Sequence, residues 1–109
     1  MTDTFKVLGQ SNPAATTLTT LYTVPAVTQA AGSTLVVCNQ AASAGSFRVA
    51  VRPAGAAIDP KHYLAYDTAI AANTTVVLDI GITLATTDVV SVYASSTSQS
   101  FSLFGTEVT

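Results

Sequence analysis

The sequence predicts an all-β domain, an antiparallel β-sandwich of about eight strands with a jelly-roll-like or immunoglobulin-like topology. Three observations predict it. Apolar residues recur with a period of two in most segments. Gly, Pro, Asn and Ser interrupt the chain roughly every 8–12 residues. Thr and Val, whose branched side chains suit a pleated sheet, supply 18 and 13 of the 109 residues. We expect residues 1–109 to form a single domain.

The N-terminal part of the chain predicts a short strand and a turn. Residues 5–9 are the strand, and Asn12 before Pro13 favours extended geometry and a turn. Because residues 1–16 are otherwise rich in small or polar side chains, they are also a candidate for an extended arm that reaches a neighbouring subunit.

The next two strands differ in character. Residues 17–24 are rich in Thr, and Leu18 and Leu21 are out of phase, so we expect a β-bulge at Thr19–Thr20. Residues 34–39 are a nearly continuous apolar run, which is typical of a central strand.

The second half of the chain alternates more clearly. Residues 46–52 place Phe47, Val49 and Val51 on one face and Arg48, Ala50 and Arg52 on the other, and Pro53 ends the strand. Further strands are expected at 61–67, 74–80, 88–95 and 101–108, with at most one helical turn at 69–73. The inward faces predict this core: Val49, Val51, Leu64, Val76, Leu78, Val90, Val92, Phe101 and Leu103.

Composition excludes several classes of protein. Only 9% of residues are charged, the net charge is −2 and the mean hydropathy is +0.47, which is the opposite of a disordered chain. Four cations cannot form a large basic patch, so we expect no nucleic-acid partner. The longest aliphatic run, residues 35–38, is far below the ~20 residues of a membrane span, so we expect no membrane partner.

No motif predicts an active site. His62 is the only histidine, and no Ser or Cys stands at a diagnostic distance from it. The six acidic residues do not cluster, Cys38 is alone, and there is no phosphate-binding glycine motif. We therefore expect a protein that is not an enzyme, with no catalytic residue, no metal site and no cofactor.

One stretch concentrates the charge of the chain. Five of its ten charged residues lie between positions 48 and 67. If strands 46–52 and 61–67 are neighbours, the result is either a solvated face with a cross-strand ion pair, stabilising by roughly 0.2–1 kcal/mol, or a contact patch for a partner. The candidate contact residues are Arg48, Arg52, Lys61, Tyr63 and Asp67.

Several segments resemble small virion proteins of tailed bacteriophages, a group that includes capsid cement (decoration) proteins and small tail, neck or fibre modules. The likeness covers most of the chain and is weakest around 26–33. The segments that carry it are residues 5–10, 12–15, 21–25, 47–56 (FRVAVRPAGA), 61–67 (KHYLAYD), 70–75, 81–96 and 101–108 (FSLFGTEV).

The resemblance implies a β-sandwich that assembles as a homotrimer or other homo-oligomer on the particle. The preferred role is capsid decoration, in which the protein is made in the bacterial host cytoplasm and binds the major capsid protein on the outer capsid surface of the virion. Two alternatives stay open. One is a tail, neck or fibre-associated protein. The other is a carbohydrate-binding adhesin with a groove lined by some of Tyr22, Tyr63, Tyr66 and Tyr93.

Overall fold

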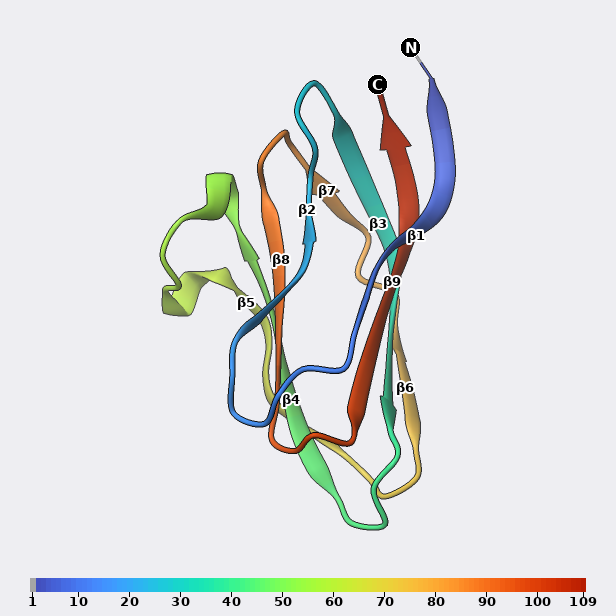
Figure 1. The fold of residues 1–109 in the computed structure, drawn as a ribbon, viewed down its shortest axis with the longest axis vertical. Coiled ribbons are helices and arrows are strands. Elements are labelled where there is room, and N and C mark those ends of the chain that lie inside the picture. Colours follow the sequence, from blue (N-terminus) through green and yellow to red (C-terminus); the bar gives the residue numbers. More distant parts are fainter. Residues whose placement is uncertain (1) are drawn as a thin grey trace.

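A computed structural model describes residues 2–109 and confirms an all-β sandwich (Figure 1). Sheet A has the strand order β1-β9-β3-β6, with β7 also paired to β3, and sheet B has the order β2-β8-β4-β5. The strands are β1 (Asp3–Ser11), β2 (Thr19–Thr23), β3 (Gln29–Asn39), β4 (Gly45–Arg52), β5 (Tyr63–Ile70), β6 (Thr75–Leu78), β7 (Ile82–Leu84), β8 (Val89–Ala94) and β9 (Gln99–Val108). Two short 3₁₀ segments, η1 (Pro53–Gly55) and η2 (Pro60–His62), lie between β4 and β5.

The order of the strands is that of a jelly roll. The chain crosses between the sheets from β1 to β2, β2 to β3 and β3 to β4, and again from β5 to β6, β7 to β8 and β8 to β9. Setting β7 aside, two antiparallel four-stranded sheets remain, as in jelly-roll domains. The structure therefore selects one of the two topologies that the sequence left open.

The predicted strands all occur, with shifted ends. Strand β3 is longer than the expected 34–39, and the expected strand 61–67 begins later, because residues 60–62 form η2. The bulge in β2 lies between Thr20 and Tyr22, close to the expected position. Strand β7 was not expected, since three residues are too short for a period of two to stand out.

Residues 3–11 do not form a free arm. They are strand β1, which pairs antiparallel with β9 from Asp3 to Ser11, and Leu8 from this strand is buried in the core. Met1, the first residue of the proposed arm, lies outside the described residues. Residues 12–18 connect β1 to β2 and cross to the other sheet, with Pro13 buried.

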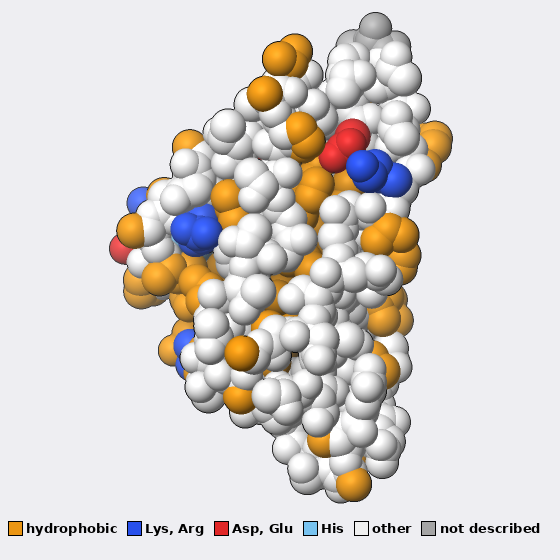
Figure 2. All heavy atoms as spheres, viewed as in Figure 1, with side chains coloured by type: hydrophobic (Ala, Val, Ile, Leu, Met, Phe, Trp, Pro, Cys, Tyr) orange, Lys and Arg blue, Asp and Glu red, His pale blue; other side chains and the backbone are white. Residues whose placement is uncertain are grey.

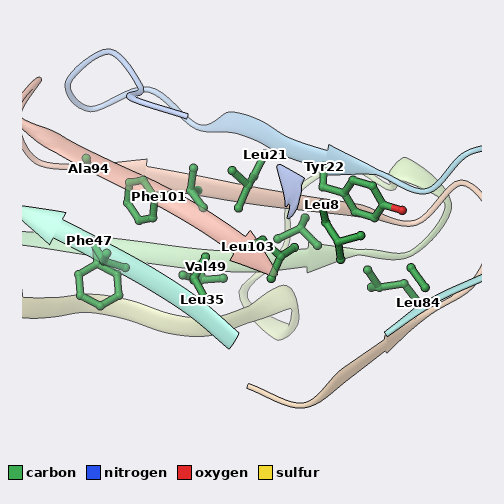
Figure 3. Close-up of a cluster of buried hydrophobic side chains, with 14 of the residues drawn as sticks. Leu8, Leu21, Tyr22, Leu35, Phe47, Val49, Leu84, Ala94, Phe101 and Leu103 are labelled. Carbon is green, nitrogen blue, oxygen red and sulfur yellow. The ribbon is translucent and has the colours of Figure 1, made fainter. Parts of the chain in front are cut away.

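The core lies between the sheets (Figure 3). Of the predicted core residues, Val49, Val90, Val92, Phe101 and Leu103 are at most 1% exposed, while Val51, Val76 and Leu78 are partly buried against that cluster. Phe47 and Phe101 meet edge to face, with ring centroids 6.2 Å apart.

The prediction that Leu64 is a core residue is wrong. Val49 pairs with Ala65 and Ala50 with Tyr63, so Leu64 is an extra residue in β5 without a partner in β4. This β-bulge turns Leu64 outward, where it is 51% exposed, and Ala65 packs against the core instead.

Candidate functional site

The predicted contact patch is built around a second β-bulge in β5. Phe47 pairs with Thr68 and Val49 with Ala65, so Arg48 of β4 faces two residues of β5, Tyr66 and Asp67. Asp67 has φ +48°, a left-handed conformation that is uncommon outside glycine. The bulge thus directs the carboxylate of Asp67 to the guanidinium of Arg48.

Arg48 and Asp67 form a two-point ion pair. The Nε–H of Arg48 donates to Oδ1 of Asp67 at 2.7 Å, and Nη2 donates to Oδ2 at 3.3 Å. The hydrogen bonds that Arg48 donates to Asp67, together with the negative charge of Asp67, raise the pKa of Arg48 above its already high value. The guanidinium of Arg48 therefore keeps its positive charge, and the carboxylate of Asp67 lies directly against it and offsets it.

Aromatic rings enclose the guanidinium. Its central carbon lies 4.1 Å from the centroid of the Tyr66 ring and 4.2 Å from that of the Tyr93 ring, which is cation–π geometry. Tyr63 stands against Tyr66 edge to face, with centroids 4.9 Å apart and an interplanar angle of 85°. We call the group of Arg48, Tyr63, Tyr66, Asp67 and Tyr93 the Arg48 patch.

A hollow of about 510 Å³ opens beside this patch and is lined by Pro60, Tyr63 and Tyr66. Tyr66 is 58% exposed, so its ring is available at the surface. The volume is within the range of small-ligand sites, roughly 300–1,000 Å³.

The other two predicted contact residues have different roles. Arg52 donates to Oγ of Ser91 and to the carbonyl oxygens of Gly55 and Ala56, so it braces the segment that contains η1. Lys61 lies in η2 and is exposed, and its backbone N–H donates to the Asp59 carboxylate. The structure thus brings Arg48, Tyr63 and Asp67 together and gives Arg52 and Lys61 other contacts.

Two residues of the patch, Tyr66 and Tyr93, were not among the predicted contact residues, although the sequence offered both as candidates for a carbohydrate groove. Tyr93 alternates with the buried Val90 and Val92 along β8, and this alternation places it on the outer face with Arg48, its partner across the strands. Tyr66 lies two residues after Leu64, so simple alternation would place it on the core face, but the two bulges of β5, which no sequence signal marks, leave it outward.

The outer face of sheet A carries a second candidate surface. Phe5 and Val7 of β1 and Phe104 of β9 are 82%, 44% and 37% exposed, and Val7 pairs with Phe104. They line a hollow of about 600 Å³ with Lys6, Ser33, Gly105 and Thr106. We call Phe5, Val7 and Phe104 the Phe5 patch.

Apolar side chains continue beyond the Phe5 patch on the same face. Val77 of β6 is 60% exposed, and its partner in β3, Val36, is half-buried. Cys38 is also half-buried on this face. Strands β3 and β6 therefore carry apolar side chains on both faces, one face in the core and the other at the surface.

A small polar cluster joins the two sheets. The hydroxyl of Tyr22 in β2 donates to Oε2 of Glu107 in β9 at 2.6 Å, and Nζ of Lys6 in β1 pairs with Oε1 at 3.2 Å. Burial and the bond to Glu107 raise the pKa of the Tyr22 hydroxyl, while the bonds from Tyr22 and Lys6 lower the pKa of Glu107.

Charged groups are otherwise sparse. Figure 2 shows few charged side chains on this face, among them one acidic and one basic side chain that lie next to each other at the upper right. His62 is buried, and its Nδ1 accepts the backbone N–H of Asp59. Within residues 2–109, no three His, Cys, Asp or Glu side chains are grouped to hold a metal ion. In the same range, no helix has the length and apolar character needed to cross a membrane.

The fold and these surfaces define a small jelly-roll domain with apolar and aromatic groups on its outer faces. Comparison with known proteins adds a structural likeness. A chain in the structure of infectious bursal disease virus, Gx strain, superposes with a TM-score of 0.50 and 15% sequence identity over 97% of this chain. The match spans 30% of that viral chain. No family model and no curated protein matches the sequence.

Proposed function

We propose that this protein is a non-enzymatic virion structural protein of a tailed bacteriophage, and specifically a capsid cement (decoration) protein. In this role it forms homo-oligomers on the outer shell and stabilises the lattice of the major capsid protein. The sequence resemblance supports the phage assignment. The structural likeness to a chain of a virus supports a virion role, and jelly rolls are frequent in viral capsids.

The observation that carries the proposal is the Phe5 patch. A monomer gains nothing from a phenylalanine that is 82% exposed beside two further apolar side chains. Apolar surface of this kind is stabilising only when it is covered, at roughly 25 cal/mol for each Å² removed from water. We assign the Phe5 patch to contact between sister chains, with a homotrimer as the preferred assembly.

The edge of sheet A supports the same assignment. β1 is the terminal strand of its sheet, so one side of its backbone has no strand partner within residues 2–109. Charged side chains are one common protection of an exposed edge. Of the two on β1, Asp3 and Lys6, Lys6 is engaged by Glu107. A neighbouring subunit that covers β1 and Phe5 would shield both the edge and the apolar side chains.

Capsid decoration and a tail, neck or fibre position differ in copy number. Quantitative gel analysis and mass spectrometry of purified particles should find this chain in a number comparable to the major capsid protein. A copy number similar to that of tail components would instead indicate a protein of the tail, neck or fibre. Particles that lack the chain would refute the virion role.

A further inference from the structure

We propose that the hollow beside the Arg48 patch binds carbohydrate, through a hexopyranose residue of a neutral polysaccharide. This activity is separate from the structural role proposed above. It concerns the outer face of sheet B, whereas the proposed contact between sister chains lies on sheet A.

The walls of the hollow fit the apolar face of a sugar. The perpendicular rings of Tyr63 and Tyr66 form a corner, and Pro60 completes the lining. A hexopyranose has a flat face of C–H groups that packs on an aromatic ring, and its hydroxyls need polar partners at the rim. A tyrosine side chain provides both functions, because its ring is apolar and its hydroxyl is polar.

The site is held in place before any ligand arrives. Arg48 lies between Tyr66 and Tyr93 and is fixed by two hydrogen bonds to Asp67. The left-handed backbone at Asp67 is part of this arrangement, and such conformations often occur at binding sites. Little side-chain entropy is therefore lost when a ligand binds. This matters for a sugar, because its contacts with a protein are weak and a large entropy loss would cancel them.

Charge selects the kind of occupant. Because Arg48 and Asp67 offset each other, the patch has no excess charge to attract a nucleic acid or a strongly anionic polymer. The side chain of Asp67 is 49% exposed, so its oxygens can still accept hydrogen bonds from sugar hydroxyls. The hollow is lined by three residues, which suits one sugar ring better than an extended peptide.

The test is a glycan array of bacterial surface polysaccharides probed with the intact protein, followed by NMR titration with the free monosaccharides of each hit. We expect binding to neutral hexopyranoses with shifts at Tyr63 and Tyr66. Tyr66→Ala should weaken binding by at least roughly tenfold, since it removes an aromatic wall. Leu64→Ala is the matched control, because Leu64 is similarly exposed on the same strand but does not line the hollow.

Three outcomes would overturn the proposal. These are an array without hits, binding that Tyr66→Ala and Tyr63→Ala leave unchanged, and a major capsid protein that binds at these tyrosines while no glycan does. Unchanged thermal unfolding of each variant would show that lost binding is not lost folding. The virion role is tested separately by the copy number of the chain on purified particles. It can therefore hold or fail whatever the result for carbohydrate binding.

Discussion

At the residue scale, alternation along a strand locates side chains until a bulge changes the phase. Arg48, Val49 and Val92 follow the alternation and lie where the sequence predicts. Leu64 does not, because β5 contains an extra residue opposite β4 at two places. Local sequence carries no mark of these bulges, since they depend on how β5 pairs with β4.

Because the bulge turns Leu64 outward, we expect Leu64 to contribute far less to stability than a core leucine. Leu103→Ala should lower the free energy of unfolding by about 2–5 kcal/mol, because Leu103 is fully buried. The same change at Leu64 should cost less than about 0.5 kcal/mol. Urea unfolding of both variants checks this, and equal losses would mean that Leu64 is a core residue after all.

The inter-sheet cluster predicts a pH dependence. The pKa of Glu107 lies below its ordinary 4.5. The contribution of Glu107 to the free energy of unfolding is therefore complete above pH 4.5 and is lost as the pH falls through the lowered pKa. The pKa of Tyr22 lies above its ordinary 10.0. The contribution of Tyr22 to the free energy of unfolding is therefore complete below pH 10.0 and is lost as the pH rises through the raised pKa.

Tyr22→Phe should lower the free energy of unfolding by about 1–2 kcal/mol near pH 7, since it leaves the Glu107 oxygen with one bond fewer. The difference in the free energy of unfolding between this variant and the unchanged protein should narrow as the pH falls from 4.5 towards the lowered pKa of Glu107. Unfolding measured from pH 3 to pH 8 tests this, and a difference that is constant over the whole range would contradict the role of Glu107.

At the element scale, the turn between β2 and β3 contains a strained residue. Val27 has φ +57° and is 88% exposed, and a β-branched residue is costly in this left-handed conformation. Asn tolerates this conformation far better.

Val27→Asn should therefore raise the free energy of unfolding by about 0.5–1 kcal/mol. The matched control is Ala26→Asn in the same turn, where φ is not positive and no gain is expected. Thermal unfolding of both variants measures the difference. A loss of stability in Val27→Asn would show that the apolar side chain has a structural role in this turn.

Strand positions were largely predictable, and their exact ends were not. The strand of residues 46–52 is marked by alternation and by Pro53, whereas β1 extends to residues 3–11 because β9 pairs with it along this length. Pairing partners so far apart in the sequence leave no local signal, and for the same reason the sequence of residues 1–16 is compatible with an extended arm as well as with a paired strand.

At the scale of the whole molecule, the sequence predicted the sandwich but not its topology. A jelly roll and an immunoglobulin-like fold share short alternating strands, and they differ only in which distant strands become neighbours. The same limit applies to the surfaces. The Phe5 patch forms only when β1 meets β9, so no local sequence pattern predicts it.

The Phe5 patch predicts self-association that depends on its aromatic side chains. Sedimentation velocity should detect an oligomer at micromolar concentration, and Phe5→Ser combined with Phe104→Ser should shift the protein to monomers. Because both side chains are on the outer face, the double variant should still fold and unfold cooperatively as a monomer, with a midpoint that no longer depends on protein concentration. An oligomer that persists in the double variant would assign the interface to another face.

We propose that this domain is a building component of a virus particle, in which the apolar face of sheet A is covered. A cryo-electron microscopy map of purified particles tests it most directly. We predict jelly-roll density on the outer shell, with Phe5 and Phe104 against a sister chain. Particles with no such density, or domains whose Phe5 patch faces open solvent, would contradict the account.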